Sequence, residues 1–139
     1  MTGLVVVKIS DLTGAPLDWA VAQVEKVDGL VTHKGRPAFE RDFDPDCWAD
    51  ETDLEAFKCW QFYTPSTDWG RGGPLILGRG VSLRCIAPLN AWEADCWDDS
   101  VVPSRYCQNE AETPLIAACR AIVASVLGDT VSVPKELLS

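Results

Sequence analysis

The chain has 139 residues, of which 47% are hydrophobic and 24% are charged, the ordinary balance of a folded protein of one domain. Its formal net charge of −9 repels duplex nucleic acid and anionic membranes, which argues against general binding to either. No stretch approaches the roughly 20 apolar residues of a transmembrane helix. The first residues also lack the basic leader and cleavage site of a signal peptide, so we expect a cytoplasmic protein.

A strand and then a helix are expected at the start of the sequence. Leu4–Ile9 is a β-branched run that predicts a buried strand. Apolar residues at helical spacing predict an amphipathic helix from Thr13 to about Val27, with Ser10 as a candidate N-cap and Pro16 early enough to be tolerated. The pair Asp28-Gly29 is expected to end this helix.

The segment at about 30–61 has no clear period and is interpreted as a long, partly ordered insertion. Gly35, Pro37 and Pro45 interrupt it, and Asp53–Phe57 predicts at most one helical turn. Its acidic and aromatic residues indicate that it packs against something, either a partner surface or a ligand that it covers.

Two strands, Pro74–Leu77 and Val81–Ile86, are expected to form a hairpin through the turn Gly78–Gly80. A second acidic insertion, again irregular, occupies about 88–112. In both insertions Trp, Phe and Pro interrupt the acidic residues. Solvated loops explain this pattern, and mimicry of nucleic-acid charge aimed at a basic host protein is the alternative.

The last helix has the clearest signals for its two ends. Thr113 is a good N-cap, Pro114 fits the first helical position, and Gly128 follows an apolar stripe as a stop signal. Val131–Val133 predicts a short strand after it. The sequence therefore predicts an α+β protein of one domain over residues 1–139, with a small mixed or antiparallel sheet and two amphipathic helices packed on one face.

The sequence contains no recognised catalytic or metal-binding motif. It has no Gly-x-Ser-x-Gly elbow and no Cys-x-x-Cys pair, and His33 is the only histidine. The six cysteines are interpreted as reduced thiols that pack as small hydrophobic groups. We therefore predict no catalytic residue, no metal and no cofactor. A pair of His33 with a cysteine, and cation binding by carboxylates such as Asp98-Asp99, are the alternatives.

The loop Ser66–Pro74 is the strongest candidate for function. Its hydroxyls, carboxylate, indole and guanidinium suit a ligand that contains a ribose, a phosphate and a base. The residues that supply these groups are Ser66, Thr67, Asp68, Trp69 and Arg71. Gly72 and Gly73 would let the main chain approach a ligand closely, although the Lys-Ser/Thr ending of a phosphate loop is missing. The alternative is a structural turn in which Asp68 or Thr67 caps the backbone and Trp69 fills the core.

Three blocks of the sequence carry a further signal when they are taken together and in order. The blocks contain Leu17–Ala22, then Pro65–Trp69 with Gly72–Ile76, then Thr113–Ala118 with Val123–Gly128. They resemble the NinX-like family of small proteins encoded by lambdoid and related tailed phages and prophages, a family of unknown function. The resemblance covers about 10–27, 62–87 and 113–138. The two insertions have no counterpart in it, and Leu77-Gly78 stands where family members often carry charged residues.

The resemblance implies a phage accessory protein that acts in the cytoplasm of the infected cell. Together with the chemistry of the loop, it implies that the protein binds and sequesters a nucleotide-derived immune signal, such as a cyclic nucleotide or a cyclic ADP-ribose variant, without cleaving it. The residues assigned to the ligand are Tyr63, Ser66, Thr67, Asp68, Trp69, Arg71, Gly72, Gly73 and Arg79.

In this hypothesis Trp69, together with Tyr63, stacks on the base, and Arg71 and Arg79 pair with phosphate. The three residues before Trp69 bind ribose or base edges. A homo-oligomer is expected, because such pockets are often built between subunits. Two other hypotheses stay open, namely an inhibitor or adaptor that binds a host or phage protein through the insertions, and a hydrolase of the same signal. Duplex nucleic acid and membranes are not expected partners.

Overall fold

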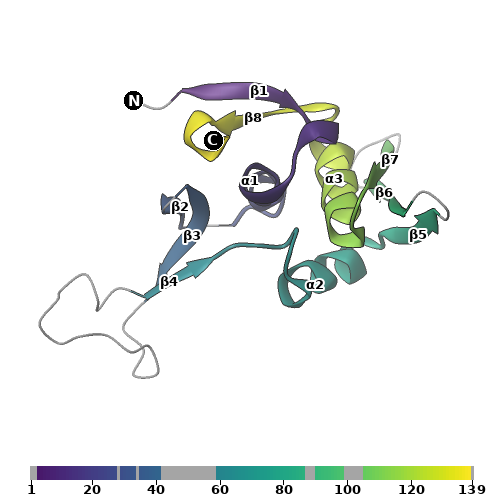
Figure 1. The fold of residues 1–139 in the computed structure, drawn as a ribbon, viewed down its shortest axis with the longest axis horizontal. Helices are drawn as coiled ribbons and strands as arrows, with labels where there is room; N and C mark the ends of the chain where they lie inside the picture. Colours follow the sequence, from purple (N-terminus) through teal and green to yellow (C-terminus); the bar gives the residue numbers. More distant parts are fainter. Residues whose placement is uncertain are drawn as a thin grey trace, which may run out of the picture.

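The computed structural model describes residues 3–27, 29–33, 35–41, 59–86, 90–98 and 105–138 (Figure 1). These residues form three α-helices and three small sheets, so the predicted α+β class is confirmed. The strand pairings within the described residues are antiparallel, which was one of the two predicted alternatives. The strands are divided among separate sheets that surround the helices.

The helix α3, Pro114–Leu127, is the element around which the others pack. Thr113 caps it by accepting a hydrogen bond from the Ile116 N–H at 3.1 Å, and Gly128, at φ 91°, ends it. Both predicted ends of this helix are therefore confirmed. The helix α1, Gly14–Val24, packs on one side of α3, and a three-stranded sheet packs on the other (Figure 1).

The first predicted helix is confirmed as α1, but its ends differ from those expected. Thr13 is the N-cap residue, whereas Ser10 belongs to a short 3-10 helix, η1, Ile9–Asp11. This turn places the Ile9 side chain in the core, which explains why the helix begins later than a cap at Ser10 would allow. The helix ends at Val24, before the predicted stop at Asp28-Gly29.

The two ends of the described chain pair with each other. The strand β1, Leu4–Lys8, runs antiparallel to β8, Thr130–Pro134, and a short 3-10 helix, η3, Lys135–Leu137, follows β8 (Figure 1). Both predicted strands are confirmed. The prediction that the first strand is buried is wrong, since Leu4 is 64% and Val6 67% exposed. Only the alternate side chains of β1 face the protein.

The segment interpreted as the first insertion contains a sheet of three strands. These strands are β2, Leu30–His33, β3, Arg36–Arg41, and β4, Cys59–Phe62, paired in that order. The prediction of an irregular segment is wrong for these residues, because pairing between β3 and the distant β4 defines the sheet. The turn expected at Asp53–Phe57 lies outside the described residues.

The segment interpreted as the second insertion also contains regular structure. A sheet in the order β5-β6-β7 is formed by Ser82–Ile86, Ala91–Asp98 and Arg105–Ala111. Ala94 and Cys96 are buried on the side of α3, and they alternate with Glu93 and Asp95. The prediction of an irregular acidic loop is wrong here, because Glu93 and Asp95 lie on the outer face of a strand, while Asp98 is buried on the other face.

The predicted hairpin of residues 74–86 is wrong, since Trp69–Arg79 forms the helix α2. The Asp68 carboxylate caps this helix by accepting a hydrogen bond from the Gly70 N–H at 2.9 Å. Gly80, at φ 64°, takes the left-handed conformation that commonly ends a helix. The glycines that predicted a tight turn therefore mark a helix C-terminus, and only the second strand of the hairpin exists, as β5.

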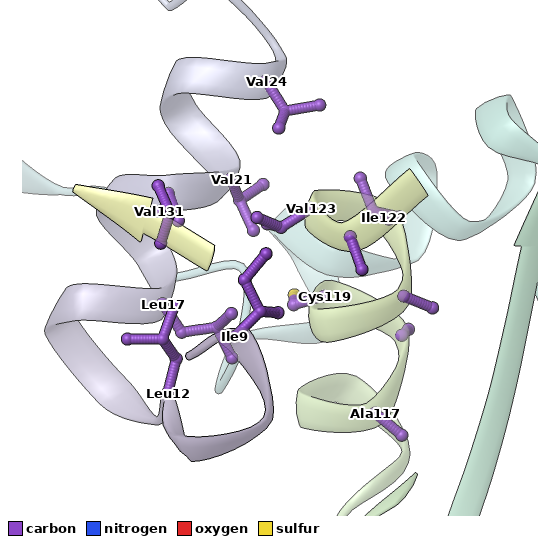
Figure 2. Packing of buried hydrophobic residues seen from close by; sticks show 14 of the residues in the cluster. Ile9, Leu12, Leu17, Val21, Val24, Ala117, Cys119, Ile122, Val123 and Val131 are labelled. Carbon is purple, nitrogen blue, oxygen red and sulfur yellow. The ribbon is translucent and has the colours of Figure 1, made fainter. Parts of the chain in front are cut away.

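The hydrophobic core lies mainly between α1 and α3 (Figure 2). Ala20 of α1 is fully buried, as are Ala117 and Ala121 of α3, and Ala117 lies on the side of α3 that points away from α1 (Figure 2). The largest buried aliphatic side chains around them are Ile9, Leu17, Val21, Ile122, Val123 and Val133. Cys85, Cys96 and Cys119 are free thiols, and Cys96 and Cys119 are buried as predicted, whereas Cys85 is exposed. No helix in the described part of the chain is long and apolar enough to cross a membrane.

Candidate functional site

A buried carboxylate joins α1 to the candidate loop. Asp18 is only 3% exposed, although it lies on an apolar helix. Its Oδ1 accepts a hydrogen bond at 2.8 Å from the backbone N–H of Ser66, which is 48 residues away in the sequence. This bond fixes the position of the loop relative to the core, because both partners are buried.

The ionisation of Asp18 is strongly affected by its surroundings. Burial raises the pKa of this carboxyl from 3.8 to about 6, while hydrogen bonding by Ser66 and the charge of Arg36 oppose the rise. The protonated form is therefore favoured in the folded protein more than in the unfolded chain. Asp18 faces the backbone and is closed off from solvent, so its role is to hold the loop.

The turn before α2 is held by its own backbone and side chains. The Asp68 N–H donates to the Thr64 carbonyl at 2.9 Å, and the Asp68 side chain caps the helix. Ser66 is buried, and its hydroxyl makes no hydrogen bond with a residue that the structure describes. Of the polar residues assigned to the ligand in this turn, Thr67 and Asp68 are exposed and Ser66 is not.

Trp69 is the first residue of α2, and its side chain is 55% exposed. The alternative in which this tryptophan fills the core is therefore wrong. The capped start of the helix holds the backbone of Trp69, so the indole is presented to solvent from a fixed position.

Arg71 lies two residues further along α2 and is held by aromatic rings. Its guanidinium carbon is 5.9 Å from the ring centroid of Tyr63 and equally far from that of Phe39. These two rings meet edge to face, with centroids 5.9 Å apart and planes at 89°. Burial raises the pKa of Tyr63 to about 12, so the phenol stays neutral beneath the arginine.

A second arginine lies on the neighbouring sheet. The guanidinium carbon of Arg36, on β3, is 4.3 Å from the ring centroid of Phe62 on β4. Arg36 also contributes a positive charge at Asp18, which places it near the anchor of the loop. Arg36 and Phe62 lie on one face of the β2–β4 sheet and Phe39 on the other, because Phe62 is the register partner of Ala38 and side chains alternate along a strand.

The remaining predicted residues are less well placed for a shared ligand. Gly72 is buried, and a Cβ there would lie 2.4 Å from the Pro65 carbonyl oxygen, so this glycine serves helix packing. A Cβ on Gly73 would meet nothing within 4 Å. Arg79 pairs with Glu25 at 2.5 Å and lies about 12 Å from Arg71 along the helix, because eight residues separate them.

Sequence reasoning missed Asp18, Arg36 and Phe39 as parts of the site. A signal for Asp18 was present, because it precedes Val21 by three residues and Ala22 by four and so shares their buried face. No local signal could reveal the other two, since strand pairing brings them close.

Two open grooves lie elsewhere on the described surface. One, of about 1020 Å³, is bounded by β1, the start of α1, η3 and Arg36. The other, of about 490 Å³, lies between β7 and the β1–β8 end of the molecule. Neither is lined by residues 66–74. The described residues contain no group of three or more His, Cys, Asp or Glu side chains that could hold a metal ion.

Comparison with known sequences gives one result. The family described as Bacteriophage P22, NinX has a sequence model that matches residues 8–126, which is most of the chain. The search of curated proteins found no match to the chain. The match spans the first two blocks that carry the resemblance and most of the third, which ends at Gly128, and it also spans both segments that were interpreted as insertions.

Proposed function

Because the chain belongs to the NinX family of phage proteins, we propose that it binds and sequesters a nucleotide-derived small molecule in the infected cell. The ligand class is a host immune signal of the cyclic nucleotide or cyclic ADP-ribose type. The protein holds this molecule without cleaving it, acts in the host cytoplasm and works as a homo-oligomer.

One observation carries the proposal. At the capped start of α2, the exposed Trp69 lies two residues before Arg71, whose guanidinium packs against two aromatic rings. Trp69 offers a flat apolar face for a base, and stacking of this kind contributes about 1–3 kcal/mol per base. Arg71 offers a planar cation that pairs with two phosphate oxygens at once. A nucleotide contains both complementary groups within one small molecule.

The surroundings of these two residues favour a preformed site. The Asp18–Ser66 bond and the Asp68 cap fix the backbone on either side of Trp69. Tyr63 supports the guanidinium of Arg71 from below and is too buried to stack on a base itself. Preorganisation of this kind lowers the entropy lost on binding.

The same chemistry favours retention of the ligand without cleavage. Arginine stays protonated under all physiological conditions, so neither Arg71 nor Arg36 can act as a general base. Asp18 has a pKa near neutrality, as a general base requires, but it is buried and bonded to the backbone of Ser66. These groups suit binding of an anion.

The test is to incubate the full chain with cyclic dinucleotides, cyclic oligonucleotides and cyclic ADP-ribose variants and then to remove the protein by filtration. We expect one compound to disappear from the filtrate and to return intact when the protein is heated. Trp69→Ala and Arg71→Ala should each weaken binding of that compound about tenfold or more.

Trp97→Ala and Arg84→Ala are the matched controls, because they remove an exposed tryptophan and an exposed arginine from another part of the surface. Both should retain full affinity. An altered compound in the filtrate would point to the hydrolase, and unchanged levels of every compound would favour a protein partner. Retention of affinity by both Trp69→Ala and Arg71→Ala would remove this site from the proposal.

A further inference from the structure

The β5–β7 sheet has one face against α3 and one face towards solvent. Side chains on the solvent face alternate with the buried Ala94 and Cys96. The residues that define this outer sheet face are Arg84, Glu93, Asp95, Trp97, Tyr106 and Glu110. It lies on the opposite side of α3 from α1 and is separate from the start of α2 (Figure 1).

The outer sheet face has a surplus of negative charge. Glu93 forms an ion pair with Arg84, and it also accepts a hydrogen bond from the side chain of Gln108. Asp95 and Glu110 form no ion pair with a described residue, so the described side chains of this face carry three negative charges against the one positive charge of Arg84. Glu93 and Glu110 are also register partners on adjacent strands. Like charges placed opposite each other destabilise a sheet, and a bound cation would relieve this cost.

An exposed aromatic pair lies next to these carboxylates. Trp97 and Tyr106 are register partners, with ring centroids 4.9 Å apart and planes at 49°. They are 56% and 45% exposed. The Tyr106 hydroxyl donates to Asp95 at 3.0 Å, which fixes the ring beside the carboxylate. A guanidinium stacks on such a ring and bonds to such a carboxylate at the same time.

From these features we infer that the outer sheet face is a docking surface for an arginine-rich segment of a partner protein. The partner's arginines stack on Trp97 and Tyr106 and pair with Asp95 and Glu110. This surface is independent of the proposed nucleotide site, and the inference stands whether or not that site binds a nucleotide.

Charge complementarity selects this partner over two others. A single-stranded nucleic acid would also stack on the aromatic pair, but its phosphates would face a surplus of carboxylates. A second copy of the chain, docked through the same face about a twofold axis, would bring two acidic surfaces together. A basic protein segment satisfies both the charges and the rings.

The experiment measures binding of the full chain to a fluorescein-labelled octapeptide of alternating arginine and glycine, by fluorescence anisotropy. We expect saturable binding in 50 mM NaCl that weakens strongly in 300 mM NaCl. The reason is that the Debye length, over which charges attract each other, falls from about 14 Å to about 6 Å between these salt concentrations. Trp97→Ala should weaken binding about tenfold, and the lysine version of the peptide should bind less tightly than the arginine version.

A charge-matched pair of variants separates this surface from general attraction to an acidic protein. Glu110→Lys reverses a charge on the outer sheet face, and Glu136→Lys reverses one in η3, near the C-terminus on the other side of α1 and α3 (Figure 1). Both positions are exposed, so both variants should fold. Glu110→Lys should weaken binding about tenfold and Glu136→Lys less than about twofold.

Three results would overturn the inference. The first is the absence of peptide binding by the wild-type chain. The second is an equal loss of affinity in Glu110→Lys and Glu136→Lys. The third is tighter binding of an eight-nucleotide thymidine oligonucleotide than of the peptide. Trp69→Ala should leave peptide binding unchanged, so failure of this inference is distinguishable from failure of the proposed nucleotide site.

Discussion

At the scale of single residues, the burial of Asp18 and Trp69 is the reverse of what their side chains usually show. The carboxylate is buried and accepts a backbone hydrogen bond, while the large aromatic side chain is more than half exposed. A buried carboxylate is costly unless its polar atoms are satisfied, and Ser66 supplies that satisfaction. The molecule thus uses a polar anchor inside the protein to position an apolar surface outside it.

The raised pKa of Asp18 predicts a specific dependence of stability on pH. Its pKa is about 6 in the folded protein and near 3.8 in the unfolded chain, so the folded state binds the proton more tightly. The stability linked to this group is therefore fully present below about pH 3.8 and is lost as the pH rises through about 6. Asp18→Asn removes this loss, because the amide keeps an oxygen acceptor for the Ser66 N–H.

The difference in unfolding free energy between Asp18→Asn and the wild type should therefore rise by about 2 kcal/mol from pH 4 to pH 7. Urea denaturation at unit pH intervals measures it. A difference that is constant with pH contradicts the assignment. Asp18→Ala, which leaves the buried N–H without an acceptor, should be the least stable of the three chains at every pH, by about 1–3 kcal/mol.

At the scale of elements, α2 depends on one glycine for its contact with α3. A Cβ at Gly72 would lie 2.6 Å from Leu115 Cδ2 and closer still to the backbone of Pro65. The start of α2 can approach the loop and α3 this closely only because the side chain is absent. Gly73, the next residue in the helix, has free space around it. Gly72 is therefore required for packing, whereas Gly73 precedes Pro74, whose ring disfavours the helical conformation of a preceding residue that carries a Cβ.

Alanine substitutions at these two positions should have different effects on stability. Gly72→Ala is expected to lower the unfolding free energy by about 1–3 kcal/mol, because a backbone carbonyl must move to accept the methyl group. Gly73→Ala is expected to change it by less than about 0.5 kcal/mol, since the helix preference of alanine is opposed by the steric clash between a Cβ at this position and the ring of Pro74. Chemical denaturation of the two variants provides the measurement, and equal changes in both would contradict the packing role of Gly72.

At the scale of the whole molecule, the β1–β8 pair links the two ends of the described chain over the α1–α3 core (Figure 1). Alternation decides which side chains of this pair contribute. Val133 of β8 is fully buried against the core, whereas Val6 of β1 faces solvent. Valine is therefore expected to contribute more to the stability of the fold at position 133 than at position 6.

Truncation of these two valines tests the arrangement. Val133→Ala should lower the unfolding free energy by about 2 kcal/mol, because it removes buried methyl groups and leaves a cavity. Val6→Ala should change it by less than about 0.5 kcal/mol. Thermal unfolding of both variants is a sufficient measurement. A larger loss in Val6→Ala would indicate that the outer side of β1 is covered, for instance by a second copy of the chain.

The sequence alone determined the elements whose signals are local. Thr113 and Gly128 define α3 correctly, because capping depends on residues within one helical turn. The stretch around Ser66 was predicted to bind a ligand from its residue types, and that prediction awaits the binding experiment. The tertiary structure decided what each of those residues does, since Asp18 lies 48 positions away from the N–H that it binds.

The predictions that rested on glycines and on acidic residues were wrong, because each of these signals fits more than one local structure. Gly78 and Gly80 fit a hairpin turn and a helix end equally well, and only the capped start at Asp68 and the packing of Gly72 on α3 decide between them. The acidic residues of β6 read as a loop until their alternation with Ala94 and Cys96 is seen against α3. Local sequence specifies backbone preference, and burial against distant elements selects which preference is realised.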